Sequence, residues 1–276
     1  MCSKNRLHKT KNKFLDELAL LVKKMDKRSK AVRSSQALQV MFNLIYGYPE
    51  LLDSSSMSIV LRSLKDAEEA YYSHKSTKNW ETEVGHELQS VMNMIEHLYE
   101  HGSVQLNEQS LKTAVEALNE VTLSVLEVLS ESSSSQTADQ ATSLRTKTFG
   151  VRKMKTVIEN NSKHIGSVWN FIVAHFISLC SCKFEDMRVS TVGILAQTIS
   201  NLLVLGSIPA EQLLSIYLDI VKTKYTDVKT LVISNLKTFL TDHGYKVGEQ
   251  PLLQVVRIIK LTDSQGLLKR APPHHR

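Results

Sequence analysis

Hydrophobic residues recur along the chain at steps of three and four, from near the N-terminus to about residue 261. This spacing places apolar side chains on one face of a helix. The clearest example runs from Phe149 to Gly206, where short polar joints separate three helical segments. No region shows the sustained alternation of apolar and polar residues that is typical of strands. The pattern therefore predicts an all-α fold.

The second and third segments of residues 149–206 predict a helical hairpin. Gly206 can take the left-handed conformation that ends a helix. Such a hairpin cannot bury its apolar faces alone and needs stacked neighbours. The predicted apolar positions are Val168, Phe171, Ile172, His175, Phe176 and Leu179 in the first helix, and Met187, Val189, Val192, Ile194, Leu195, Ile199, Leu202 and Leu203 in the second.

A second hairpin follows the first at an offset of 41 residues, since the joint at residues 183–186 aligns with the joint at residues 224–227. Its first helix starts at Pro209, where a missing N–H does no harm. A fainter copy lies around Val32 and Arg33. A two-helix period of this length is typical of HEAT and armadillo repeats. The sequence therefore predicts an α-solenoid of HEAT/armadillo-like helical hairpins.

Four charged residues recur at this offset and have a predicted structural role. Asp186 and Asp227 are expected to cap the second helix of each hairpin. Arg188 and Lys229 follow two positions later, where each cation can reach carbonyls or carboxylates of the adjacent repeat. We interpret Trp169, with Trp80 in an earlier segment, as an anchor of the repeat core.

Composition divides the chain into five parts. We expect a disordered basic start (1–11), helical repeats (12–130), a Ser-rich loop or linker (131–148), further helical repeats (149–261) and a disordered tail (262–276). The run SSSSQTADQATS holds no large apolar residue and cannot contribute to a core. It either separates two domains or bulges from a single stack. Within the first set of repeats we expect helices at residues 57–72 and 80–101, and one capped by Asn107.

The net charge of +6 is concentrated at the N-terminus, where residues 1–33 hold eleven Lys and Arg against three acidic residues. Three interpretations remain open for this segment. It is a solvated helix face or exposed tail, it contacts anionic lipid, or it contacts nucleic acid. The residues that would contact an anionic surface are Lys23, Lys24, Lys27 and Arg28.

Candidate chemistry is sparse in this sequence. His97 and His101 have the spacing of a zinc pair, but no further ligand lies near them and their neighbours suit a solvated face. Cys180 and Cys182 do not form a CxxC motif, and burial of one thiol at a helix end is the favoured interpretation. No phosphate loop, nucleophile elbow or HExxH motif occurs. We therefore expect no catalytic residue, no metal and no cofactor.

The cysteine count and the hydropathy of the chain suggest the cellular compartment in which it lies. Three cysteines form no disulfide framework, which is typical of a reducing cytosol. We expect no membrane span, because no apolar run reaches the roughly 18 to 20 residues that a span requires. Asp16 and Glu17 interrupt the segment that would resemble a secretory signal. We expect a cytosolic chain that is peripheral to membranes at most.

Residues 149–206 also carry a family resemblance. Phe149-Gly150 through Ile158, Ile165 through Trp169, His175-Phe176, Cys180 and Arg188 resemble the helical repeats of the large Golgi Arf guanine-nucleotide exchange factors. Within this family they are most similar to the Mon-two branch, which lacks the exchange domain. The resemblance extends over most of residues 36–257.

The resemblance implies a non-enzymatic scaffold in membrane trafficking. Its expected location is the cytoplasmic surface of trans-Golgi and endosomal membranes, and its expected partners are a Dopey-type protein and a lipid flippase that act in cargo retrieval. The family has no catalytic residues in this region. Its members are much longer than this chain, so the resemblance also implies that the 276 residues are an internal or truncated section.

Overall fold

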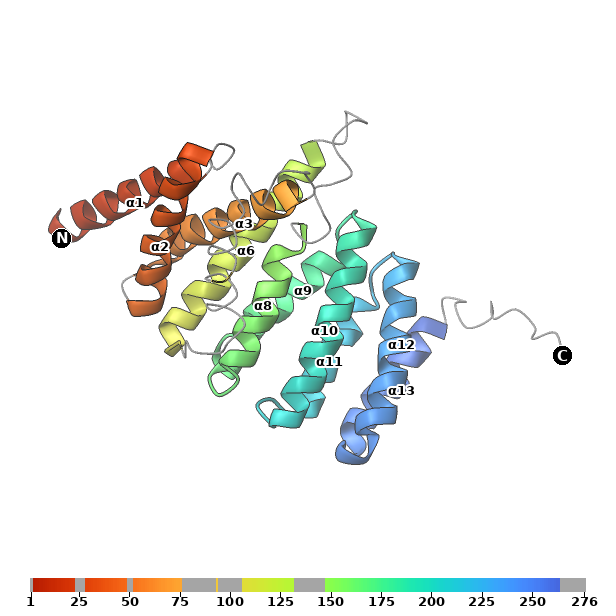
Figure 1. Ribbon diagram of the computed structural model, residues 1–276. Helices are drawn as coiled ribbons and strands as arrows, with labels where there is room; N and C mark the ends of the chain where they lie inside the picture. Colours follow the sequence, from red (N-terminus) through yellow and green to blue (C-terminus); the bar gives the residue numbers. More distant parts are fainter. Residues whose placement is uncertain are drawn as a thin grey trace. The chain divides into compact units, whose positions relative to one another are not determined.

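In the residues that the computed structural model describes, the secondary-structure elements are helices joined by turns, and no β-strand occurs among them (Figure 1). This confirms the predicted all-α class. The chain divides into two compact units, Met1–Asn161 (unit 1) and Ser162–Arg276 (unit 2). The described residues are 2–22, 28–48, 52–75, 93, 106–131 and 147–263.

Unit 1 contains five described helices, and successive helices pack on one another. Helix α1 packs on α2 and α3, α3 packs on α6, and α6 packs on α8. Aliphatic side chains such as Leu15, Met41 and Leu64 form its core, together with Phe149. The helices are α1 (Cys2–Val22), α2 (Arg28–Gly47), α3 (Ser54–Lys75), α6 (Glu108–Glu131) and α8 (Phe149–Asn160).

Two helix starts in unit 1 are fixed by side-chain caps. The side-chain oxygen of Asn107 accepts a hydrogen bond of 2.8 Å from the backbone N–H of Ser110, so the predicted cap is confirmed. Asp53 caps α3 in the same way by accepting a bond of 2.8 Å from the N–H of Ser56. Because Asp53 acts as the cap, α3 begins three residues before the predicted start at Met57.

The expected disorder of residues 1–11 is wrong for residues 2–11, which form the first half of α1. This segment has no Gly or Pro to interrupt a helix. The end of this segment contacts the start of α3, because Lys11 Nζ lies 3.2 Å from Asp53 Oδ2. Leu15, one turn further along α1, is fully buried. The helix predicted at residues 80–101 lies outside the described residues except for residue 93, which is helical.

The Ser-rich segment connects two helices of the same unit. Helices α6 and α8 lie on either side of it in sequence and pack directly on each other. The division between the units falls after Asn161, so α8 belongs with unit 1 and not with the repeats that follow it. Asn161 Oδ1 accepts a bond of 2.7 Å from the N–H of Leu106, which ties the end of α8 to the start of α6.

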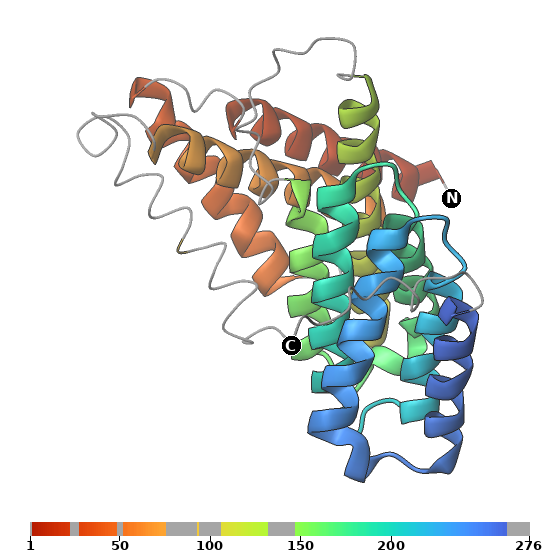
Figure 2. The same ribbon diagram turned by 90° about the vertical axis from the view of Figure 1, so that its right-hand side faces the viewer.

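In the described part of unit 2, five α-helices are arranged in two rows. Helices α9, α11 and α13 form one row, in which α9 packs on α11 and α11 on α13; α10 and α12 lie side by side in the other (Figures 1 and 2). Hairpins α9–α10 and α11–α12 join the rows. The elements are η3 (Ile165–Ser167), α9 (Trp169–Cys180), α10 (Glu185–Leu205), α11 (Ala210–Ile220), α12 (Thr226–His243), η4 (Gly244–Lys246) and α13 (Glu249–Asp263).

The predicted end of α10 is confirmed. Gly206 has a φ of 66°, and the N–H of Ser207 donates to the carbonyl of Leu202 at 3.3 Å, which closes the helix end. Two predicted core positions are wrong, because Phe171 is 47% exposed and Val189 is 40% exposed. Each lies beside the buried stripe of its helix, whose position is set by the neighbouring helices and not by hydropathy alone.

Candidate functional site

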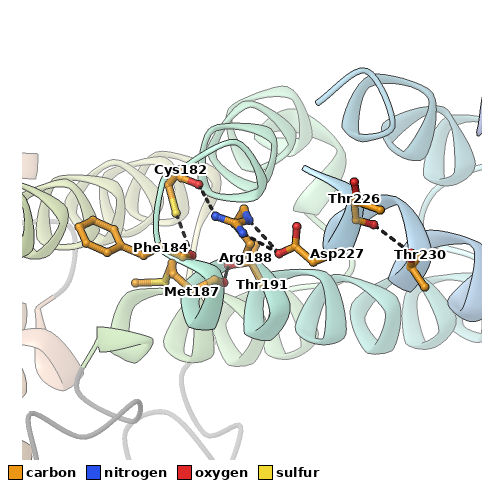
Figure 3. A network of polar contacts seen from close by, with 8 residues as sticks. All are labelled: Cys182, Phe184, Met187, Arg188, Thr191, Thr226, Asp227 and Thr230. Atoms are coloured by element: carbon orange, nitrogen blue, oxygen red, sulfur yellow. Dashed lines mark hydrogen bonds and ion pairs between the residues drawn. The ribbon is translucent and has the colours of Figure 1, made fainter. Parts of the chain in front are cut away.

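The most elaborate polar arrangement in unit 2 joins the two hairpins at Arg188, in the first turn of α10 (Figure 3). Its guanidinium is close to Asp227 of α12, with Nε donating to Oδ2 at 3.0 Å and Nη2 lying 2.8 Å from the same oxygen. Nη1 donates to the carbonyl of Cys182 at 3.0 Å. We call Arg188, Asp227, Cys182 and Tyr225 the hairpin clamp.

Tyr225 completes the clamp by stacking. The guanidinium carbon of Arg188 lies 3.7 Å from the centre of the Tyr225 ring. The side chain of Arg188 is only 6% exposed, so it is largely removed from water. A buried cation is tolerated when hydrogen bonds and an opposite charge compensate for lost hydration. The stacking, the carboxylate and the carbonyl provide that compensation here.

The clamp confirms one predicted role and corrects another. The prediction that Arg188 reaches a carboxylate of the next hairpin is confirmed by its pairing with Asp227. The prediction that Asp186 and Asp227 cap their helices is wrong. The N-cap positions are Phe184 and Tyr225, and neither helix has a side-chain cap hydrogen bond.

The aspartates fail as caps because each helix begins before its aspartate. Both then lie in the first helical turn, where a negative charge still interacts favourably with the helix dipole. Asp186 is exposed, whereas Asp227 points to Arg188. The stacking of Tyr225 was missed, although the aromatic pair Phe184 and Tyr225 recurs at the same offset of 41 residues and could have indicated it.

The other predicted repeat positions are in the core of unit 2. Trp169, the first residue of α9, is 1% exposed, which confirms its interpretation as an anchor. Lys229 is buried in the position on α12 that corresponds to Arg188 on α10. Both residues contribute to the packing of unit 2.

Unit 2 also buries three titratable side chains, on α9 and α11. Burial raises the pKa of the Cys180 thiol to about 12 and raises the pKa of the Tyr217 hydroxyl above its ordinary value. Burial lowers the pKa of His175 to about 4. All three groups are therefore neutral at pH 7. The predicted burial of one thiol at a helix end is confirmed by Cys180.

Cys182 does not provide an activated thiolate either. Burial is the main cause that raises the pKa of its thiol, and its sulfur lies 3.5 Å from the carbonyl of Phe184. Nucleophilic cysteines need a lowered pKa and access to solvent. The thiols of Cys180 and Cys182 are therefore protonated at pH 7 and are not activated nucleophiles.

Several predicted contact residues cannot be placed. Lys23, Lys24 and Lys27, and the histidines at 97 and 101, lie outside the described residues. Arg28 starts α2, but its side chain is also outside them. In the described part of the chain, no group of three or more His, Cys, Asp or Glu residues could hold a metal ion.

Helix α10 is long and apolar enough to cross a membrane by length and composition alone, contrary to the expectation that no apolar run reaches that length. Core helices of soluble proteins meet the same criterion. Helix α10 has Glu185, Asp186 and the buried Arg188 in its first turn, and it packs against α9 and α12.

Sequence comparison does not assign the chain to a family. Among the described residues of unit 2, the hairpin clamp is the best-defined polar arrangement. No known family model matches the chain, and no curated protein matches it.

Proposed function

We propose that the chain is a non-enzymatic scaffold whose helices form an α-solenoid of HEAT/armadillo-like hairpins. The hairpin clamp carries this proposal. It joins the starts of α10 and α12, with Arg188 from one hairpin and Asp227 from the next. Such a contact holds neighbouring hairpins at a fixed rotation, which stacked repeats need to present an extended surface.

Burial at the offset of 41 residues supports the same proposal. Corresponding positions on α9 and α11 are buried together, as are corresponding positions on α10 and α12. Equivalent burial is expected when each hairpin contacts its neighbours in the same way. The buried pairs include Ile172 and Leu213, Phe176 and Tyr217, Leu179 and Ile220, Met187 and Val228, Arg188 and Lys229, and Leu195 and Leu236.

The proposed biological role is membrane trafficking at the trans-Golgi network and endosomes, with a Dopey-type protein and a lipid flippase as partners. It rests on the family resemblance of residues 149–206. Several residues that carry the resemblance, among them Trp169, Phe176 and Arg188, are buried in unit 2. Because these residues are buried, the resemblance concerns the core of unit 2 and not the surface that would contact a partner. The partners are therefore tested directly.

The test is localisation and co-purification of the tagged chain in cultured cells. We expect labelling of trans-Golgi or endosomal membranes and co-purification with a Dopey-type protein. Trp169→Ala, which disrupts the core of unit 2, should lose the partner, and Asp186→Ala, at an exposed position, should keep it. A diffuse cytosolic signal with no Dopey-type partner would contradict the trafficking role.

A second candidate is binding of an anionic surface through residues 1–33. It is favoured by α1, where Phe14 and Leu21 are exposed on one side of a helix in the most basic part of the chain. Exposed apolar side chains beside lysines are typical of helices that lie on membranes. Reversing the charges of Lys23, Lys24, Lys27 and Arg28 should then abolish retention on anionic vesicles. Unchanged retention on vesicles and on heparin would refute this candidate.

A further inference from the structure

Helix α13 carries an exposed apolar stripe that its packing in unit 2 does not explain. Leu252, Leu253 and Val256 are 40%, 43% and 46% exposed. The opposite side of α13 is buried, with Val255 and Ile258 in the core. Glu249 at the start of the helix and Lys260 in its last turn are both exposed and lie on the same side as the stripe. We call Glu249, Leu252, Leu253, Val256 and Lys260 the α13 stripe.

The corresponding positions on α11 show that helix stacking does not require this stripe. At an offset of 41 residues, Leu252, Leu253 and Val256 correspond to Glu211, Gln212 and Ser215. Helix α11 has a neighbour on each side and its own hairpin partner, yet Glu211 and Gln212 remain exposed and Ser215 is only partly buried. A further hairpin stacked on α13 would therefore leave the stripe exposed. Its apolar character points to a different contact.

The order of charges along the stripe indicates what that contact is. An acidic residue lies at one end, a basic residue at the other, and three aliphatic residues lie between them. Two such helices in antiparallel pairing bring Glu249 of one copy to Lys260 of the other, at both ends. The same pairing brings Leu253 opposite Val256 in the centre. Twofold pairing of this kind is the commonest form of self-association in soluble proteins.

We propose that the α13 stripe is a self-association surface at which two copies of this chain pair as antiparallel helices. Arg257, at the edge of the stripe, lies opposite Leu252 of the second copy, where its aliphatic stem packs on the leucine. The stripe is short, so the interface is small and the dimer is transient. We expect a dissociation constant of roughly 10 to 100 μM.

Sedimentation velocity of the full chain at increasing concentration tests the dimer. We expect a reversible monomer–dimer equilibrium, which Val256→Asp weakens about tenfold or more by burying a charge at the centre of the interface. Ser215→Asp is the matched control, because it places the same charge at the corresponding position on α11 and should leave the equilibrium unchanged. Thermal melting verifies that both variants are folded.

A charge swap tests the register of the pairing. Glu249→Lys and Lys260→Glu each place like charges at both ends and should weaken the dimer several-fold, whereas the double variant should restore it. A chain that stays monomeric at every concentration, or a dimer equally stable in all these variants, overturns the proposal. Binding of the monomer to anionic vesicles or to an acidic helical peptide through Val256, without dimerisation, also overturns it, because the stripe then serves another partner.

Discussion

Two helix contacts in this chain are built in opposite ways. In unit 1, α8 approaches α6 closely because Gly150 has no side chain, and a Cβ atom placed there would lie 2.0 Å from Thr122 Oγ1. In unit 2, α10 is joined to α12 by the large side chain of Arg188, which is enclosed by Asp227 and Tyr225. The first contact requires a missing side chain, and the second requires a buried charged one. Each is therefore sensitive to a different kind of substitution.

The largest effect is expected where the core of unit 2 depends on one large side chain. Trp169→Ala removes an almost completely buried indole from the start of α9 and should lower the free energy of unfolding by about 3 to 5 kcal/mol. Chemical denaturation gives the change, and hydrogen exchange shows whether residues 162–263 lose protection. Equal stability of the variant and the parent would show that the indole does not support the core.

The pH dependence of the free energy of unfolding should show the effect of burying His175. Its Nε2 is buried without a hydrogen-bond partner, and burial lowers the pKa of its imidazole to about 4 in the folded state. Well above pH 6.5 the imidazole is neutral in both the folded and the unfolded chain, so it does not contribute to the pH dependence of stability there. As the pH falls from 6.5 towards 4, only the unfolded chain takes up the proton, and stability should fall by up to about 3 kcal/mol.

His175→Gln isolates this effect from the titration of other groups. Denaturation curves between pH 7 and pH 4 should show a shallower loss of stability for the variant than for the parent. Identical slopes would show that His175 is protonated equally easily in the folded and the unfolded chain.

A methyl group added at Gly150 should destabilise the close contact between α8 and α6. Gly150→Ala is expected to lower the free energy of unfolding by about 1 to 3 kcal/mol, because Thr122 must move and gives up its hydrogen bond to the carbonyl of Leu118. Thermal denaturation measures the change. Thr122→Ala should relieve much of it in the double variant, since the hydroxyl is the nearest atom.

Gly193→Ala is the matched control for this prediction. Gly193 is on the exposed side of α10, where an added Cβ meets nothing within 4 Å. Alanine there should stabilise the helix by about 0.5 to 1 kcal/mol. A loss of stability equal to that of Gly150→Ala would show that helix propensity and not close approach decides both positions.

The two contacts also differ in how well the sequence predicted them. Arg188 and Asp227 have counterparts at the offset of 41 residues, Lys229 and Asp186. This periodicity predicted that Arg188 reaches a carbonyl or carboxylate of the adjacent hairpin, although Asp227 was expected to act as a cap and not as its partner. Asn107 and Gly206 were predicted correctly because the conformation of a helix end depends on local residues. Nothing local reveals that Thr122 packs against Gly150, since the two residues meet only after distant segments have packed.

Other differences have the same physical origin. Phe171 has the spacing of a core residue, but the neighbouring helices leave it exposed. Asp227 is of a residue type that often caps helices, but α12 begins before it, and its carboxylate pairs with Arg188 instead. The division after Asn161 was also missed, because a Ser-rich segment looks like a boundary even when the helices beside it pack together. Long-range packing decided each of these positions.

A double-mutant cycle on Arg188 and Asp227 tests most directly whether the clamp holds the two hairpins together. Asp227→Ala, Arg188→Ala and the double variant are compared by urea denaturation, with Asp186→Ala as an exposed control at the corresponding position of α10. We predict a favourable coupling energy of about 1 to 2 kcal/mol between Arg188 and Asp227, and almost no effect of the control. Additive effects of the two substitutions would contradict the clamp.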